Sequence, residues 1–206
     1  MAERASGAPR PPTSSAIGSA SWDGRTLARE QHSDVLFTDL DGTEVRNAGS
    51  VFNRCTFRRA RFNASAHEDA AFLNCTFIGC SFFDARFLRC KLVGSCFDGC
   101  SFEIMQVKDG DWSFVGLAGA HLATAQFEGV RLREADLTRA RCKGSVLRSC
   151  DLSGASLNGA DLTSADLRGS ELATLDPREV MLTGAVIDIK QTVAIAQALG
   201  LDVRAR

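Results

Sequence analysis

The sequence contains no tyrosine, only 3 histidines and 4 prolines, and no apolar stretch long enough to cross a membrane. Its 206 residues carry a net charge of −1, which excludes a globally basic nucleic-acid binder. The first residues do not show the pattern of a secretory signal, so we expect a cytoplasmic protein. No nucleophile elbow, phosphate loop or zinc motif occurs, so we expect neither catalysis nor a cofactor or metal. Phenylalanine and glycine are abundant, with 13 and 18 copies, and this skew indicates a repeat.

A five-residue repeat runs through the chain without a change of phase. Phe or Leu occupies 21 of the 25 positions found at every fifth residue from Phe52 to Leu172. Two residues before each of them, Ala, Cys, Ser or Gly occupies 22 of 25 positions. Neither a helix nor a strand keeps such series on one buried side, whereas a coil that turns a corner every five residues does. We therefore predict an all-β solenoid of square turns, stacked through parallel hydrogen-bond ladders about 4.8 Å apart.

Composition divides the chain into three parts. Residues 1–20 are rich in Pro, Ser, Ala and Gly, and we expect a disordered N-terminal tail. Residues 21–187 form the solenoid, with an irregular first coil over 21–50 because the repeat fails at Gly42 and Asn47. Such a coil would cap the exposed edge of the stacked strands. Residues 188–206 form a C-terminal helix and dimerisation segment.

The pattern becomes helical after Ile187. Asp188 is a good N-cap, Gln191 completes a capping box, and Gly200 provides a stop, which predicts a helix over 189–199. This helix is apolar nearly all round, so it needs burial on two sides. One side can cover the last coil, and the other favours a second copy of the chain across a two-fold axis. The predicted dimerisation residues are Ile189, Val193, Ile195, Ala196 and Leu199.

The cysteines follow the repeat and do not follow a metal-binding spacing. Six of the eight lie in the small-residue series, where Ala and Ser stand elsewhere, and these are Cys55, Cys75, Cys80, Cys90, Cys100 and Cys150. Cys142 takes a central position and only Cys96 lies outside both series. We therefore predict free packing cysteines, without disulfides or zinc. His67 replaces a central Phe, and we expect a hydrogen-bonded core histidine there.

Several units carry a recognisable consensus. Residues 135–139, 160–164 and 165–169 read ADLTR, ADLTS and ADLRG, which resemble the A-(D/N)-L-x-x unit of pentapeptide repeat proteins. The resemblance covers about residues 33–187. It implies that the solenoid is a right-handed quadrilateral β-helix.

The C-terminal segment narrows this resemblance. Residues 182–203, preceded by Leu-Asp-Pro at 175–177, are similar to the dimerisation module of the quinolone-resistance pentapeptide proteins of the MfpA and Qnr type. This similarity implies a homodimeric rod that interacts with DNA gyrase, or alternatively topoisomerase IV, and protects it from fluoroquinolones by imitating DNA. The repeat has no phase-breaking insertion between Phe52 and Leu172, so we expect none of the projecting loops of many Qnr proteins.

The charge distribution limits how closely the rod can imitate DNA. A faithful copy of about 30 Å of duplex would need roughly 18 negative charges. Residues 151–188 have a net charge of −5, against +3 for residues 51–100. The candidate gyrase-binding surface therefore consists of acids in or near the last coils, namely Asp111, Asp151, Asp161, Asp166 and Glu171. In a 20-residue coil they would lie on three faces and partly encircle the rod.

Two other functions stay open. The coils could be a scaffold that presents a protein-interaction face unrelated to topoisomerases. Direct nucleic-acid binding has the local charge of +3 in its favour, but the Phe residues point inward and leave little aromatic surface for bases, so we do not expect it. The basic residues concerned are Arg54, Arg58, Arg59, Arg61, Arg86, Arg89 and Lys91.

Overall fold

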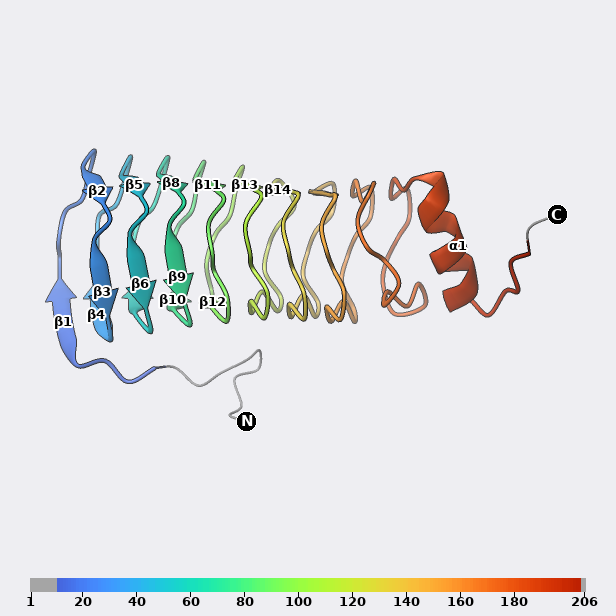
Figure 1. Ribbon diagram of the computed structural model, residues 1–206, viewed down its shortest axis with the longest axis horizontal. Coiled ribbons are helices and arrows are strands. Elements are labelled where there is room, and N and C mark those ends of the chain that lie inside the picture. The colour runs from blue at the N-terminus through green and yellow to red at the C-terminus, as the bar shows by residue number, and fades with distance from the viewer. Residues whose placement is uncertain (1–10, 205–206) are drawn as a thin grey trace.

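The structure is a computed structural model that describes residues 11–204. The chain forms a parallel β-solenoid that ends in one helix, α1 (Ile189–Ala198) (Figure 1). Each strand pairs in parallel with the strand 20 residues further on, as Phe37 pairs with Phe57 and Phe57 with Phe77. A turn therefore takes four five-residue units, and the predicted fold class is confirmed.

The strands lie on three of the four sides of the coil, and we name each side after one of its strands. The β7 face holds β1 (Ser15–Gly18), β4 (Val35–Thr38), β7 (Thr56–Arg58), β10 (Thr76–Ile78) and β12 (Cys96–Asp98). The β6 face holds β3 (Gln31–Ser33), β6 (Val51–Asn53) and β9 (Ala71–Leu73). The β8 face holds β2 (Thr26–Ala28), β5 (Arg46–Ala48), β8 (Ala66–Glu68), β11 (Arg86–Leu88), β13 (Gln106–Lys108), β14 (Gln126–Glu128) and β15 (Val146–Arg148). Isolated parallel bridges such as Ser21↔Asp41 and Asp41↔Arg61 hold the fourth side, the bridge face.

The solenoid begins earlier than the sequence predicted. Strand β1 pairs with β4 in the regular 20-residue register, so Ser15–Gly18 belongs to the coil, and the prediction of a disordered tail is wrong for these residues. The first coil is also regular, because the ladder continues past Gly42 and Asn47. Ladder bonds join backbone groups, so a central side chain can be missing while the register persists. Residues 1–10 of the predicted tail lie outside the described residues.

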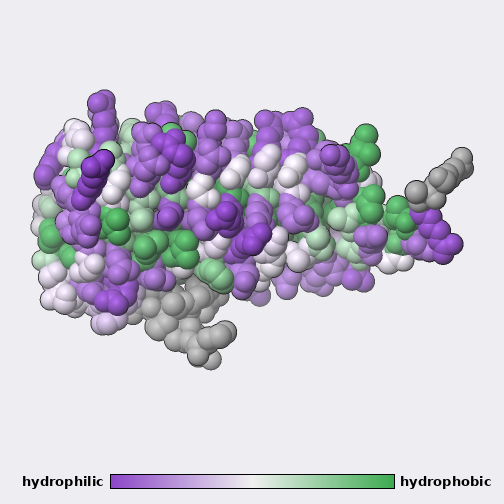
Figure 2. Space-filling model, in the orientation of Figure 1, coloured by the Kyte–Doolittle hydropathy of each residue, from purple (hydrophilic) through white to green (hydrophobic). Residues whose placement is uncertain are grey.

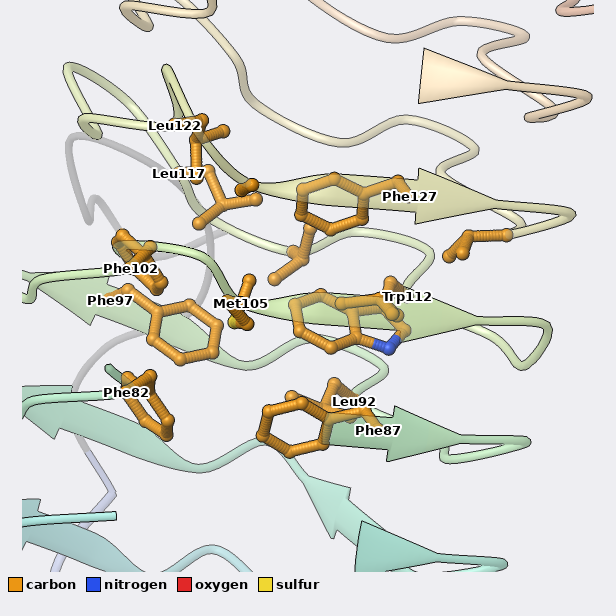
Figure 3. Packing of buried hydrophobic residues seen from close by; sticks show 14 of the residues in the cluster. Phe82, Phe87, Leu92, Phe97, Phe102, Met105, Trp112, Leu117, Leu122 and Phe127 are labelled. Carbon is orange, nitrogen blue, oxygen red and sulfur yellow. The ribbon is translucent and has the colours of Figure 1, made fainter. Parts of the chain in front are cut away.

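Aromatic side chains form the core of the N-terminal half. Rings on successive turns stack nearly parallel, and the centroids of Phe52 and Phe72 are 4.9 Å apart. Rings on adjacent faces meet edge to face, as do Phe57 and Phe62 at 5.6 Å. Figure 3 shows this pattern continuing to Trp112, which is fully buried. The 4.8 Å repeat of the backbone therefore places the rings at the separations that aromatic pairs prefer.

The inward cysteines and serines hydrogen-bond the corners of the coil. Ser95 Oγ donates to the carbonyl of Phe72 at 2.7 Å and accepts from the amide of Cys75 at 3.0 Å. The thiols of Cys75 and Cys80 donate in the same way to carbonyls 23 residues earlier, at 3.3 and 3.4 Å. Cys and Ser thus satisfy backbone groups that Ala would leave without this bond, a role that the sequence analysis did not identify.

His67 lies in the core between two polar neighbours, as predicted. It is 3% exposed and stacks on Phe87 at 4.7 Å. Asn47 Nδ2 lies 3.3 Å from its Nδ1, and Ser65 Oγ lies 3.0 Å from its Nε2. Ser65 already donates to the Phe62 carbonyl, so it accepts from Nε2, and Asn47 donates to Nδ1. This arrangement fits the neutral imidazole, and burial lowers the pKa of His67 to about 3.

We expect His67 to make the protein less stable as the pH falls from 6.5 to 4. The unfolded chain takes up a proton on this side chain below about pH 6.5, while the native state stays neutral. The free energy of unfolding should therefore drop by up to about 1.4 kcal/mol per pH unit in this window. The paired Asp carboxyls add to the loss only below about pH 4. The free energy of unfolding, measured with urea at several pH values, should depend much less on pH for Asn47→Leu with His67→Phe than for the wild type. An equal pH dependence of the two proteins would refute this assignment.

The helix docks on the last coil as its capping pattern predicted. Asp188 accepts from the amide of Gln191 at 3.1 Å, while Gln191 Oε1 accepts from the amide of Asp188 at 2.7 Å. Gln191 Nε2 then donates to the carbonyls of Leu167 and Ser170, both at 2.7 Å. The helix end matches within one residue, with Leu199 as the C-cap. Across residues 11–204, no helix is long and apolar enough to span a bilayer.

Candidate functional site

The predicted acidic residues lie on three faces, as their spacing indicated. Asp111 and Asp151 flank Arg131 in one column of the β6 face, which Glu171 extends by a further turn. Asp161 lies on the bridge face below Met181, and Asp166 lies on the β8 face below Val186. The acids therefore surround the last coils and do not form a single stripe.

Arginines neutralise three of these five acids. Arg131 Nη1 lies 2.9 Å from Asp111 Oδ2, and Arg133 Nε donates to Asp151 Oδ2. Asp166 pairs with both Arg148 and Arg168. Hydrogen bonds from Arg168, with a further contribution from Arg148, hold the pKa of Asp166 well below its usual range. These carboxylates are ionised, but their charge is largely compensated.

Asp161 and Glu171 have no arginine partner within residues 11–204, although the charge of Lys143 contributes to a lowered pKa of Asp161. Each accepts a backbone hydrogen bond two residues on, Asp161 from Thr163 at 3.0 Å and Glu171 from Ala173 at 2.8 Å. The hydrogen bonds from Thr163 also lower the pKa of Asp161. Neither side chain forms an ion pair with any residue in the described range 11–204. These two carboxylates are the strongest candidates for contact with a cationic partner.

Asp111 and Asp151 have basic surroundings. Both line a groove of about 490 Å³ where the β8 and β6 faces meet. Arg89, Lys91 and Arg131 line the same groove, with Gly110, Gly129, Val130 and Ser149 between them. Three cations beside two carboxylates give this corner a mixed charge, so it is a poor substitute for a phosphate backbone.

The basic cluster at 51–100 is also neutralised. Arg54 donates two hydrogen bonds, of 2.7 and 2.6 Å, to Asp34. Arg59 donates two to Asp39 and Arg89 two to Asp69 in the same way. In each pair the partner lies 20 residues earlier, directly below on the previous turn. Arg61 and Arg86 pair with Asp41 and Asp84. Because most of its arginines are engaged, this cluster offers little free charge to nucleic acid.

Exposed apolar side chains are concentrated at the C-terminal end of the rod. Ile189 is 90% exposed, and Val193 and Leu199 are 43% and 50% exposed. All three were predicted dimerisation residues. The last coil and the segment after the helix add Met181, Val186, Leu201 and Val203 to this exposed set. We call these seven residues the C-terminal apolar surface.

The other two predicted dimerisation residues face the rod more closely. Ile195 is partly buried and packs against the core of the last coils, and Ala196 is half-buried. The helix therefore uses Ile195 and Gln191 to cover the solenoid and leaves Ile189 and Val193 outside. One side of α1 therefore covers the last coil, as expected, and the other side is exposed.

The structure has a second apolar surface, which was not predicted from the sequence. On the β6 face the outward positions of successive turns hold Val51, Ala71, Leu73 and Val93, all half-buried, and Phe114 beside them is 50% exposed. Figure 2 shows hydrophobic side chains gathered along this part of the rod. The signal was present in the sequence, because these outward positions of successive repeats are apolar.

The described residues hold no group of three or more His, Cys, Asp and Glu side chains suited to a metal ion. None of the eight cysteines forms a disulfide. Burial raises the pKa of the Cys90 and Cys150 thiols to about 11, which makes both poor nucleophiles at neutral pH.

Two family models match the coils. The model described as "Pentapeptide repeat region" matches residues 50–127. The model described as "Pentapeptide repeats (8 copies)" matches residues 117–154 and 140–173. A search of curated proteins found no match.

Solved structures of similar fold include QnrB1, a plasmid-mediated fluoroquinolone resistance protein. A trypsin-treated variant of QnrB1 is 22% identical, with a TM-score of 0.52 over 92% of this chain and 99% of that chain. Full-length QnrB1 is also 22% identical, with a TM-score of 0.50 over 90% of this chain and all (100%) of that one. HetL, a pentapeptide repeat protein involved in heterocyst differentiation regulation in the cyanobacterium Nostoc sp. strain PCC 7120, is 17% identical, with a TM-score of 0.40 over 84% of this chain and 86% of that chain. At 22% identity the likeness to QnrB1 shows the fold alone.

Proposed function

The chain is a pentapeptide repeat protein, and we propose that it acts without catalysis, as a homodimeric rod that binds DNA gyrase and protects or modulates it in the presence of fluoroquinolone-like poisons. The C-terminal apolar surface carries this proposal, because joining two rods there brings both sets of last coils together. Residues 151–188 contribute −5 from each protomer, so the centre of the dimer becomes the most acidic part of the assembly.

Charge and position together support gyrase as the partner. A protein surface built to hold duplex DNA attracts concentrated negative charge and a long, narrow shape. The carboxylates of Asp161 and Glu171, the two without an arginine partner in residues 11–204, lie beside the proposed junction, and the neutralised coils extend away from it. The rod would thus imitate the negative charge of DNA only at the centre of the dimer, while the other coils would provide a long, narrow shape like that of the duplex.

A supercoiling assay with purified gyrase tests the proposal directly. Wild-type protein should inhibit supercoiling, or restore it in the presence of a fluoroquinolone, at concentrations where the rod is dimeric. A matched decatenation assay with topoisomerase IV shows which of the two enzymes the protein affects at lower concentration. If neither enzyme responds with or without drug, the proposal fails.

We expect Ile189→Asp with Val193→Asp to convert the dimer to a monomer. Two exposed apolar side chains become charged in a surface that must lose water on association, while the contacts of Gln191 with the last coil remain. Light scattering after size exclusion should report half the mass, and the gyrase effect should fall by at least about tenfold. Gln197→Asp, at another exposed position of α1, is the control. An unchanged mass would show that the helix is not the interface.

The β6 face favours one alternative, a scaffold that presents a protein-docking face unrelated to topoisomerases. The row of Val51, Leu73 and Val93 ends in exposed Phe114, and such apolar rows on a soluble rod typically serve protein contacts. If the β6 face serves a partner other than a topoisomerase, Leu73→Ser with Val93→Ser should leave the gyrase effect unchanged. Loss of the gyrase effect in that variant, with the dimer intact, would place the contact on the β6 face.

A further inference from the structure

Two cysteines lie one above the other at the corner where the β7 face meets the bridge face. Strand β10 pairs in register with β12, and Ser81 pairs with Ser101, so Cys100 lies one turn directly above Cys80. Their Cα atoms are therefore about 4.8 Å apart, the spacing of a parallel ladder. The amide of Cys80 donates to Cys100 Sγ at 3.4 Å. A disulfide needs Cα atoms about 4.4–6.8 Å apart, so the backbone permits one here.

This corner is open because glycine occupies its outward position on three successive turns. These residues are Gly79, Gly99 and Gly119. A Cβ atom added at Gly99 or Gly119 would meet no atom of residues 11–204 within 4 Å. Cys100, which follows the second glycine, is therefore only half-buried, whereas Cys80 is buried. Solvent thus reaches one thiol of the pair.

A small hollow leads to Cys100. It has a volume of about 80 Å³, and Cys100 lines it together with Phe97, Phe102, His121 and small residues of the next turn. One water occupies about 30 Å³ in the liquid, so the hollow has room for a hydrogen peroxide molecule, which is roughly twice as large. His121 accepts a hydrogen bond from Arg141 at 2.8 Å, so its Nε2 does not compete for the proton of the thiol.

The two thiols share a hydrogen bond that eases the loss of one proton. The bond from Cys100 lowers the pKa of the Cys80 thiol, although burial acts in the opposite direction. The same bond and burial raise the pKa of Cys100, so the second proton is held tightly. Cys90 and Cys150 have no cysteine on the adjoining turns, and burial raises the pKa of each to about 11. The pair therefore ionises more readily than these cysteines, and its remaining proton can lie on either sulfur.

We propose that Cys80 and Cys100 are a reversible oxidation site, at which a peroxide converts the two thiols to a disulfide between adjacent turns. The Cys100 thiolate attacks one oxygen of hydrogen peroxide and becomes a sulfenic acid, while the other oxygen takes up a proton and leaves as water. The Cys80 sulfur then attacks the sulfenic sulfur, the S–S bond forms, and the sulfenic oxygen leaves as a second water. The two thiols lose two electrons and two protons, and the peroxide gains them.

The disulfide joins residues 20 apart and so links one turn to the next. Both thiols must first turn away from the carbonyls to which they now donate, those of Phe57 at 3.4 Å and Phe77 at 3.5 Å. The closed loop limits the freedom of the unfolded chain, so the oxidised rod should resist urea better than the reduced rod. Small thiols reverse the change by exchange, because this corner is open to solvent.

Treatment of the full chain with hydrogen peroxide, followed by alkylation and mass spectrometry of its peptides, tests the site. We expect a peptide in which Cys80 is linked to Cys100, and dithiothreitol should abolish it. Cys55 and Cys75 provide a matched control, because they also lie on adjacent turns but both are buried. They should form at least about tenfold less disulfide in the same time.

Gly99→Asn tests the access route without changing either thiol. Asn74 adopts the same corner conformation, with a φ of 51° against 58° for Gly99, so the coil accepts this residue. Corner side chains lie against the next turn, as Arg59 Cγ does at 3.9 Å from the place of a Gly79 Cβ atom. The new side chain should cover the hollow and slow formation of the disulfide by at least about fivefold.

Cys80→Ala separates the two steps of the reaction. Ala60 and Ala120 occupy the same column, so alanine fits this position. In this variant Cys100 should stop at the sulfenic acid, which dimedone traps, and no disulfide should form there.

The possible results either support the site or overturn it. Lack of a Cys80–Cys100 link in the wild type overturns it, as does a Cys55–Cys75 link that forms equally fast. A link between Cys100 and Cys96 overturns the pairing across turns. An unchanged rate in Gly99→Asn overturns the hollow as the route of the peroxide.

Discussion

Phe82→Asp should unfold the protein, whereas Phe83→Asp at the next position should leave it folded. Phe82 is 1% exposed and stacks between Phe62 at 5.5 Å and Phe102 at 5.8 Å. It also meets Phe77 and Phe97 edge to face at 5.4 and 5.5 Å. A carboxylate in this place loses its hydration without gaining a partner, which costs several kcal/mol beyond the lost ring contacts.

This cost is comparable to the whole stability of an ordinary domain, about 5–15 kcal/mol. A stacked rod is stabilised by contacts between neighbouring turns, so one disrupted turn also separates the coils on either side of it. Phe83 is 49% exposed on the bridge face, and the same change there adds a charge to a surface already in water. Far-UV circular dichroism and urea unfolding of the two variants provide the comparison. A folded Phe82→Asp protein would contradict the inward orientation of the repeat.

The buried positions of the solenoid could be predicted from the sequence because a single geometric rule determines them. Every central and every small position is buried by the same corner geometry, so a period of five identifies them without any knowledge of their partners. The caps of α1 were equally local, since Asp188 and Gln191 bond each other across three residues. Features determined by a few consecutive residues were therefore predicted well.

The start of the solenoid was missed because its stabilisation is not local. Ser15–Gly18 has only one large apolar residue, Ile17, and its composition is that of a flexible tail. The segment is ordered by backbone hydrogen bonds to β4, which any side chain permits. The prediction of an irregular first coil, which was based on Gly42 and Asn47, was wrong for a related reason. The ring of Phe62 lies 2.9 Å from the place of a Gly42 side chain, and Asn47 bonds His67, so both exceptions are compensated by the following turn.

The acids of the candidate site could be located but not ranked. Their faces followed from the 20-residue turn, yet Arg133 reaches Asp151, and Arg148 reaches Asp166, across 18 residues. Such diagonal pairs depend on how long side chains lie across the corner between turns, which the repeat does not specify. Only the structure separates the compensated Asp151 and Asp166 from Asp161 and Glu171, which have no arginine partner within residues 11–204.

This ranking determines the substitution that should abolish action on gyrase. Asp161→Lys with Glu171→Lys should remove the gyrase effect while the coils stay folded. The pair of changes raises the charge of residues 151–188 from −5 to −1 and reverses the two carboxylates that have no arginine partner. Both side chains project from the coil, so the cost in stability is limited to the local hydrogen bonds from Thr163 and Ala173, about 1 kcal/mol for each bond. Reversal of Asp166 would be less informative, because it would leave Arg148 and Arg168 unpaired.

The matched control is Asp98→Lys with Glu103→Lys. These acids are exposed, and the charge changes by the same amount, but they lie about three turns away, or ~14 Å along the rod. That distance exceeds the Debye length of ~8 Å in physiological salt, so the control should retain its action on gyrase. The supercoiling assay gives the comparison, and light scattering verifies that both variants remain dimers. Because Glu171 also borders the groove between α1 and the last coil, Asp161→Lys alone is tested alongside, and it should weaken the effect without changing the dimer. Equal activity of all variants at wild-type concentration would show that the acids of the last coils do not contact gyrase. The interaction would then have to depend on the shape of the rod or on its β6 face.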